Sequence, residues 1–166
     1  LTSLYNRRGF FRTYNDYAEG GVKDDCMVIS VDLDNLKLIN DNFGHNEGDN
    51  AILTMANALK SAADENDICA RFGGDEYVVF GKGKGEYEMT AYIDKVNEYL
   101  DKYNLSSNKP YNVHGSFGGC IMPKGTKMHI DYYINAADSK MYVNKETHKR
   151  TRMLYSYNKD DRESEK

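Results

Sequence analysis

The chain of 166 residues carries a formal net charge of −4, with 40% hydrophobic and 29% charged residues. That length suffices for one domain with a sizeable core, and the composition is ordinary for a soluble globular protein. The acidic balance argues against a dedicated nucleic-acid or anionic-membrane surface, and no apolar run is long enough to span a membrane.

The chain opens with a predicted helix followed by a buried strand. Apolar residues recur at helical spacing over residues 10–18, and Asn6 is placed to act as the N-cap. Residues 26–31 are almost all apolar, which is typical of a strand buried on both faces. This strand leads directly into Asp32-Leu33-Asp34, so carboxylates stand at the end of a buried element.

Two helices separated by a polar loop are expected next. The first covers residues 35–42, and the loop covers residues 44–49. Asp49 is a natural N-cap for the second helix, because the residues that follow it repeat at helical spacing. The apolar positions of this helix are Ile52, Met55, Ala56, Leu59 and Ala63.

A β-hairpin with an unusual turn follows. Two short apolar runs, residues 68–70 and 77–80, flank Gly73-Gly74-Asp75-Glu76. The glycines leave the backbone open to close approach by another group. The two carboxylates suit Mg²⁺ carrying phosphates, because Mg²⁺ prefers a few carboxylates together with substrate oxygens. Taken alone, the tip also fits an exposed hairpin whose charges serve only solubility.

The remainder of the chain predicts a helix, a strand, a second helix and a short closing strand. The first helix has periodic apolar residues between positions 89 and 103, and the strand covers residues 113–122. The last helix is marked by apolar residues at 130–141, and the closing strand covers residues 152–155. We place the domain at residues 1–156 and expect a charged, disordered tail over residues 157–166.

The alternation of helices and strands around one antiparallel hairpin predicts an α/β sandwich with a mixed sheet. In such a sheet Asp32, at a strand end, and Asp75, at a neighbouring hairpin tip, can meet over one edge. The sequence thus predicts one acidic site built from two segments that are distant along the chain.

Five ordered blocks of this sequence resemble the GGDEF domain family of bacterial diguanylate cyclases. The blocks are Leu1-Thr2-Ser3-Leu4-Tyr5-Asn6-Arg7-Arg8, residues 32–45, Gly48-Asp49, residues 71–77, and Ala137-Asp138 with Met141, Tyr142 and Lys145. The resemblance covers residues 1–155, in order and at the expected spacings. It implies a palm-like α/β sandwich with a central mixed five-stranded β-sheet flanked by helices, similar to class III nucleotide cyclases.

The resemblance also implies a reaction in which two GTP molecules condense to cyclic di-GMP and two pyrophosphates. The 3′-hydroxyl of each GTP attacks the α-phosphorus of the other, with one GTP held by each domain of a homodimer. Divalent ions, Mg²⁺ or Mn²⁺, stabilise the negative charge that develops and lower the pKa of the attacking hydroxyl.

The metal-binding positions of the family have counterparts here. By this match Asp32, the carbonyl of Leu33 and Asp75 bind the metal. Glu76 matches the second acid of the signature, and it is either a further metal ligand or the general base. Asp75 and Glu76 are therefore the candidate catalytic pair.

The nucleotide-binding positions are matched as well. Gly73-Gly74 would let the nucleotide lie against bare backbone. Asn40 and Asp49 match the pair that reads guanine, and a carboxylate can accept hydrogen bonds from the N1 and N2 hydrogens of that base. Lys37 and Lys145 match lysines that contact phosphates.

Several of these residues also have purely structural interpretations. Asp49 fits a helix N-cap, Asp34 fits a cap of the short helix, and Asn40 fits an exposed helix position. His45 fits a hydrogen-bond partner that orders its loop. The two lysines also fit ordinary solvated surface positions.

The chain departs from the family pattern near the signature. Tyr77 replaces its final Phe at a position expected to pack, and Asn35 stands where an aromatic residue is common. Relatives with a product-inhibition site carry Arg-x-x-Asp; here Asp67 is retained but Asp64 replaces the Arg. Because a carboxylate repels the phosphates that a guanidinium binds, we predict a degenerate inhibitory site and no product inhibition through it.

The leading function from the sequence is an active diguanylate cyclase. The alternative is a catalytically silent GGDEF domain that binds GTP and acts as a regulatory or dimerisation module. Intact Asp32 and Gly73-Gly74-Asp75-Glu76 favour activity. The missing Arg argues against a cyclic di-GMP receptor, and Asp49 argues against a related cyclase that uses adenine.

The cysteines and the first residue bear on the cellular setting. Cys26, Cys69 and Cys120 are odd in number and lack metal-ligand spacing, so we expect buried thiols in the reducing cytoplasm. No signal peptide is visible. The chain begins at Leu1 rather than at Met, which we interpret as a processed chain or a domain cut from a longer protein. We expect that longer protein to carry an N-terminal sensory or dimerisation module and to be either soluble or membrane-anchored.

Overall fold

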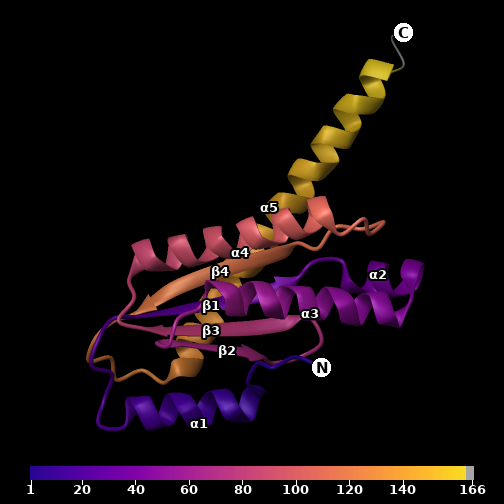
Figure 1. Ribbon diagram of the computed structural model, residues 1–166. Coiled ribbons are helices and arrows are strands. Elements are labelled where there is room, and N and C mark those ends of the chain that lie inside the picture. The colour runs from indigo at the N-terminus through magenta and orange to yellow at the C-terminus, as the bar shows by residue number, and fades with distance from the viewer. Residues whose placement is uncertain (164–166) are drawn as a thin grey trace.

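A four-stranded sheet is the centre of the fold (Figure 1). The computed structural model describes the backbone of residues 1–163 and the side chains through residue 149. The strands are β1 (Cys26–Leu33), β2 (Asp67–Arg71), β3 (Glu76–Lys82) and β4 (Gly115–Met122), in the order β2-β3-β1-β4. All neighbouring strands are antiparallel. Because β3 lies between β1 and β2, the chain crosses from β1 to β2 in a split β-α-β arrangement.

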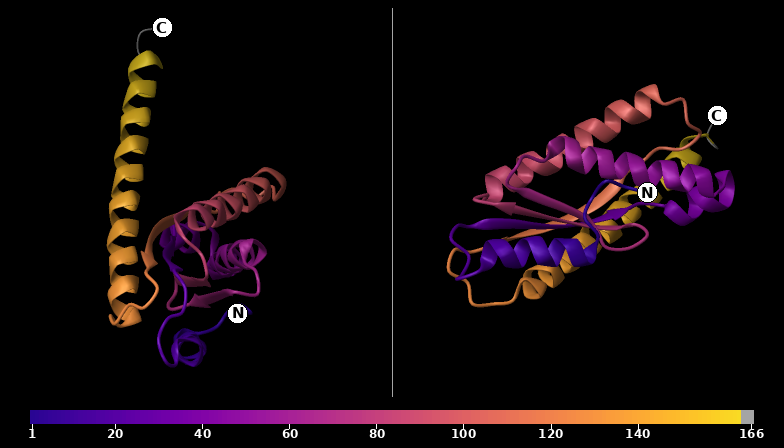
Figure 2. Two further views of the ribbon diagram at one scale, coloured as in Figure 1. Left: turned by 90° about the vertical axis from the view of Figure 1, so that its left-hand side faces the viewer. Right: turned by 60° about the horizontal axis from the view of Figure 1, so that its bottom comes forward.

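Helices cover both faces of this sheet. They are α1 (Arg7–Ala18), α2 (Leu36–Phe43), α3 (His45–Ala62), α4 (Glu86–Ser106) and α5 (Ile130–Glu163). Figure 2 shows α5 as a rod on one side of the sheet, with α3 and α4 on the other. Residues of α1 pack on the same face as the start of α5.

Strand β1 is buried on both faces, as its apolar sequence predicts, and it contributes to two cores. Met27, Ile29 and Val31 belong to the core under α3 and α4, whereas Cys26 and Val28 belong to the core under α1 and α5. Successive side chains of a strand point to opposite faces. Continuing this alternation therefore places the side chain of Asp32 on the α5 side of the sheet.

The sheet differs from the expected one in strand number and direction. It has four strands rather than five and is antiparallel rather than mixed, apart from an isolated parallel bridge between Tyr5 and Ala70. The closing strand expected at residues 152–155 is wrong, because α5 continues through them to Glu163. No glycine or proline interrupts residues 142–163, so nothing in the sequence stops the helix there. The segment expected to be a tail is helical over residues 157–163, and residues 164–166 lie outside the described residues.

One predicted helix boundary agrees with the structure and another does not. The N-cap at Asn6 is confirmed, since its side-chain oxygen accepts a hydrogen bond from the N–H of Gly9 over 2.8 Å. The expected loop over residues 44–49 is wrong, because α3 begins at His45, immediately after α2 and Gly44. Gly44 has a φ of 90°, which permits the sharp bend between the two helices. Asp49 consequently lies inside α3 and is not its N-cap.

The cysteines match the expectation of unpaired thiols. All three are free, with Cys26 and Cys69 buried and Cys120 half-buried. Burial raises the pKa of the Cys69 thiol to about 11, so this group stays protonated near neutral pH. Among the described residues, none of the helices combines the length and the apolar character needed to cross a bilayer.

Candidate active site

Carboxylates from two segments meet at the end of β1. Asp32 pairs in register with Glu76 of β3 on one side and with Ser116 of β4 on the other. Residues directly opposite each other in antiparallel strands project from the same face. The N–H of Leu33 donates to the carbonyl of Asp75 over 2.8 Å, which ties the hairpin tip to the end of β1. The structure thus brings Asp32 together with Asp75 and Glu76.

The two oxygens of Asp32 have different surroundings. The ammonium of Lys145, from α5, lies 3.1 Å from Oδ2, whereas Oδ1 is buried without a hydrogen-bond partner. Burial raises the pKa of the Asp32 carboxyl, and nearby Asp75 and Asp34 add to this effect while the hydrogen bond from Lys145 opposes it. A buried anionic oxygen without a partner is costly, so a cation beside Oδ1 would be stabilising.

Asp34 accepts a hydrogen bond from a strand residue and does not cap the helix that follows it. Its Oδ1 accepts a hydrogen bond from the Ser116 hydroxyl over 2.7 Å, and its N–H donates to the carbonyl of His114 over 2.9 Å. The N-cap of α2 is Asn35, and no side chain caps this end of the helix. The interpretation of Asp34 as a helix cap is therefore wrong, and this residue instead joins β1 to β4.

Arg71 orders the turn that carries the two glycines. Its Nε donates to the carbonyl of Gly73 over 3.0 Å, and its Nη2 donates to that of Gly74, also over 3.0 Å. A Cβ added at Gly74 would meet nothing within 4 Å, and one added at Gly73 would come within 3.2 Å of Glu76 Oε2. The turn therefore presents bare backbone beside the carboxylates, and the guanidinium holds that backbone in place.

Asn40 and Asp49 come from the two helices that meet at Gly44. Gly48 is buried, and a Cβ added to it would collide with the side-chain amide of Asn40. Asn40 thus lies against the backbone of Gly48, the residue before Asp49. The Asp49 side chain is exposed on α3. The bend thus places the Asn40 side chain beside the turn of α3 that carries Asp49. The role of Asn40 and Asp49 in reading guanine remains a prediction.

The two lysines expected to contact phosphates lie on different helices. Lys37 is exposed on α2, and Lys145 is half-buried against Asp32. The predicted contact of both with phosphates is untested, as is the role of His45, which is the exposed first residue of α3. A small hollow of about 30 Å³ beside Lys145 is lined by Asp34, Asn35, Ser116, His148 and Lys149. This hollow adds two basic residues to the lysines expected from the sequence.

The positions of the degenerate inhibitory site share an internal cation. The ammonium of Lys84 lies 2.6 Å from Asp67 Oδ2 and 2.9 Å from Asp64 Oδ2. The side chain of Asp67 is completely buried. Asp64 and Asp67 are therefore paired within the domain, and the loss of product inhibition at these positions stays a prediction.

A polar network joins the start of α3 to the segment between α4 and β4. The Tyr111 hydroxyl donates to the Glu47 carboxylate and accepts from the Asn50 amide over 3.0 Å. Lys109 Nζ lies 3.0 Å from Glu47 Oε1. Glu47 and Tyr111 lie 64 positions apart, so no local pattern in the sequence reveals this contact. The network ties Tyr111 to the turn of α3 that carries Asp49.

The residues at the end of β1 fit a metal that substrate helps to bind. Among the described side chains, no group of three or more His, Cys, Asp or Glu is arranged to enclose a metal ion. Mg²⁺, however, commonly uses one or two carboxylates and takes its remaining ligands from water and phosphates. The unpartnered oxygen of Asp32 is open to such a cation, and the Leu33 carbonyl and Asp75 as its further ligands stay a prediction.

Sequence comparison places this chain among signalling domains. The family model described as "Diguanylate cyclase, GGDEF domain" matches residues 1–151. Diguanylate cyclase DgcP of Escherichia coli is 29% identical over 155 residues, which cover 91% of this chain and 45% of that protein. The chain spans less than half the length of the curated relatives that it matches.

Structure comparison finds the same kind of domain. The GGDEF domain of YfiN from Pseudomonas aeruginosa aligns with a TM-score of 0.73 and 28% identity, covering 89% of this chain and 93% of that one. Diguanylate cyclase SiaD from the same organism, solved in complex with its activator SiaC, aligns with a TM-score of 0.78 and 23% identity. That alignment covers 88% of this chain and 56% of SiaD, and it shows similarity of fold.

Proposed function

Because this chain belongs to the GGDEF domain family, we propose that it is a diguanylate cyclase domain, which condenses two GTP molecules into cyclic di-GMP and two pyrophosphates. The convergence of Asp32, Asp75 and Glu76 at the end of β1, with one buried oxygen of Asp32 left unpartnered, is the observation that best supports this activity. A silent domain has no need to keep such a costly arrangement intact.

The chain's own residues supply most of what the transfer requires. Asp32, the Leu33 carbonyl and Asp75 would hold Mg²⁺ or Mn²⁺, which stabilises charge on phosphate oxygens and lowers the pKa of the attacking 3′-hydroxyl. Glu76, opposite Asp32 in the sheet, is a further ligand or accepts the proton of that hydroxyl. Lys145, whose ammonium lies 3.1 Å from Asp32 Oδ2, would contact phosphates bound to the same metal.

Asp49 and Asn40 give the site its preference for guanine in this proposal. The Asp49 carboxylate accepts from the N1 and N2 hydrogens of guanine, and adenine has no equivalent pair. A hydrogen bond to a charged group contributes about 1.5–3 kcal/mol. Asp49→Asn should therefore weaken GTP binding by about 10- to 100-fold, as measured by calorimetric titration, with little change in ATP binding.

Catalysis requires two such domains in this mechanism. One domain holds one GTP, and each 3′-hydroxyl must reach the α-phosphorus of the other nucleotide, so two copies face each other with their sites together. A dimerising module outside this chain would supply that arrangement. We place the reaction in the cytoplasm, in agreement with the unpaired thiols.

The deciding experiment fuses the domain to a dimerising coiled coil and incubates it with GTP and Mg²⁺, and it identifies the product by mass. Cyclic di-GMP is expected from the wild-type domain. Asp75→Ala should reduce its rate at least about 100-fold, because metal-ion stabilisation contributes several kcal/mol. Asp94→Ala, at an exposed position of α4, is the matched control and should leave the rate unchanged.

The same experiment distinguishes the alternative. If the dimerised domain binds GTP and yields no cyclic di-GMP, it is a catalytically silent GTP-binding module that acts on a partner. If Asp75→Ala and Asp94→Ala turn over GTP equally well, the assignment of the metal site is wrong.

A further inference from the structure

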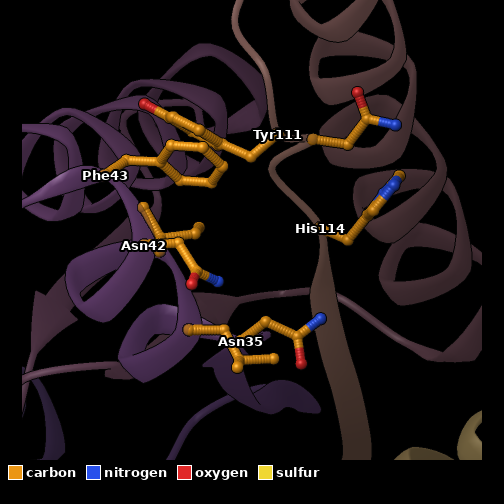
Figure 3. A pocket seen from close by; sticks show the side chains of 8 residues that line it. Asn35, Asn42, Phe43, Tyr111 and His114 are labelled. Carbon is orange, nitrogen blue, oxygen red and sulfur yellow. The ribbon is translucent and has the colours of Figure 1, made fainter.

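A hollow of about 420 Å³ lies between α2 and the segment that joins α4 to β4. Figure 3 shows the Tyr111 side chain reaching over the ring of Phe43, with Asn42 on the same side and His114 across the opening from them. Two of its apolar residues are well exposed, Leu38 to 57% and Phe43 to 40%. The full lining is Asn35, Leu38, Ile39, Asn42, Phe43, Tyr111, Asn112 and His114.

The chemistry of this lining defines the class of ligand. The rings of Phe43 and Tyr111 lie 5.5 Å apart at an angle of 35° and offer a surface for a planar ring. The three asparagines supply both donors and acceptors for the edge of such a ring. No Asp, Glu, Lys or Arg is among the lining residues, so a charged ligand would lose its hydration without gaining a counter-charge. The hollow therefore fits an uncharged planar heteroaromatic ring the size of a nucleobase.

This hollow is separate from the proposed guanine site. Its residues from α2 and the N-cap of that helix, at positions 35, 38, 39, 42 and 43, lie three or four positions apart and so share one face. Asn40 is on another face, where its amide lies against Gly48 of α3. Neither Asn40 nor Asp49 lines the hollow.

Tyr111 connects the two places. Its ring forms a wall of the hollow, while its hydroxyl is bonded to Glu47 and Asn50, which flank Gly48-Asp49 in α3. A ring that stacks on Tyr111 within this preformed space restricts the motion of that side chain. GTP binding at Asp49 then costs less conformational entropy, because Tyr111 is already held in place.

We propose that this hollow binds an uncharged planar heteroaromatic ligand and that its occupancy tightens GTP binding through Tyr111. The coupling rests on the proposed guanine contact of Asp49, whereas the binding of the ligand does not. Coupling free energies between sites correspond to affinity changes of about 5- to 150-fold. Because one hydroxyl carries the connection here, the expected tightening is about fivefold.

Binding is tested on the full chain by amide chemical shifts with nicotinamide as the probe and nicotinate, the same ring with a carboxylate, as the charged comparison. A ligand as small as nicotinamide should bind in the hollow with a Kd on the order of 1 mM. The amide signals that shift should be those of α2 and of residues 111–114. Nicotinate and the cavity-filling Asn42→Phe variant should each weaken binding at least about tenfold.

The control is Asn97→Phe, the same substitution at an exposed position of α4, which should bind nicotinamide as the wild type does. Equal binding of nicotinate, unchanged binding by Asn42→Phe, or no shifts at about 10 mM nicotinamide overturns the ligand assignment. Circular dichroism of both variants verifies that they are folded.

Coupling is tested by titrating GTP with and without saturating nicotinamide. The wild type should bind GTP about fivefold more tightly with the probe, and Tyr111→Phe, which keeps the ring and loses the hydroxyl, should show no such change. Nicotinamide binding with unchanged GTP affinity overturns the coupling. Absence of GTP binding by every variant overturns the proposed function and the coupling with it, while the first experiment still decides the ligand site.

Discussion

Lys84 holds two carboxylates together at the edge of the sheet, and its replacement tests how the domain tolerates a buried charge. The Lys84 side chain is 14% exposed, that of Asp67 is 0% exposed and that of Asp64 is 55% exposed. Lys84→Met keeps an aliphatic side chain of similar length and removes the ammonium. Asp67 then remains buried without its cation.

The expected loss of stability follows from this burial. Breaking a buried ion pair costs about 3–5 kcal/mol, because the remaining charge is uncompensated. Lys84 retains some contact with solvent, so we take the lower end, about 3 kcal/mol in the free energy of unfolding. In a chain of this size each kcal/mol lowers Tm by about 2–4 °C, which gives a decrease of about 6–12 °C.

Urea and thermal unfolding followed by circular dichroism measure this loss. Asp64→Asn, at the exposed partner, should cost less than about 1 kcal/mol, and Lys84→Met combined with Asp67→Asn should recover most of the stability. Lys84 lowers the pKa of Asp64, so the small contribution of that pair is present at neutral pH and declines as the pH falls through that lowered value. A loss below about 1 kcal/mol for Lys84→Met, or no recovery in the double variant, would refute the argument.

Further predictions concern the inhibitory positions and the packing. Calorimetric titration should detect no cyclic di-GMP binding at Asp64 and Asp67; micromolar binding that Asp67→Ala abolishes would contradict the loss of that site. Gly118→Ala should lower the free energy of unfolding by about 3 kcal/mol, because the added Cβ meets the backbone of α5; unchanged urea unfolding would show that α5 can shift. Tyr77→Phe should cost about 1 kcal/mol, since the Tyr77 hydroxyl donates to the buried Ile52 carbonyl over 3.0 Å; equal Tm values would mean that this bond contributes nothing.

The bonded Tyr77 hydroxyl shows where sequence and structure agree in part. Its position in the signature indicates packing, and the residue is indeed buried. The hydroxyl, however, ties β3 to α3, and this contact spans 25 positions of the chain. A family pattern with Phe at this position does not reveal such a bond.

The sequence by itself determined the elements and the acidic motif of this domain. Burial of β1, the hairpin around Gly73-Gly74-Asp75-Glu76 and the cap at Asn6 all follow from residue types at short spacing, because periodicity, turn chemistry and capping act between near neighbours. The family resemblance was carried by the same short blocks.

Only the tertiary structure decided how these pieces meet. The ion pair of Lys145 with Asp32, the hydrogen bond of Ser116 to Asp34 and the brace from Tyr111 to Glu47 join residues that are far apart in the chain. The expected fifth strand is part of α5, because no residue in that segment stops the helix. The expected loop after Gly44 is part of α3, because that helix has an apolar face to bury. Contacts between distant segments depend on the packing of the whole domain, and no local pattern encodes them.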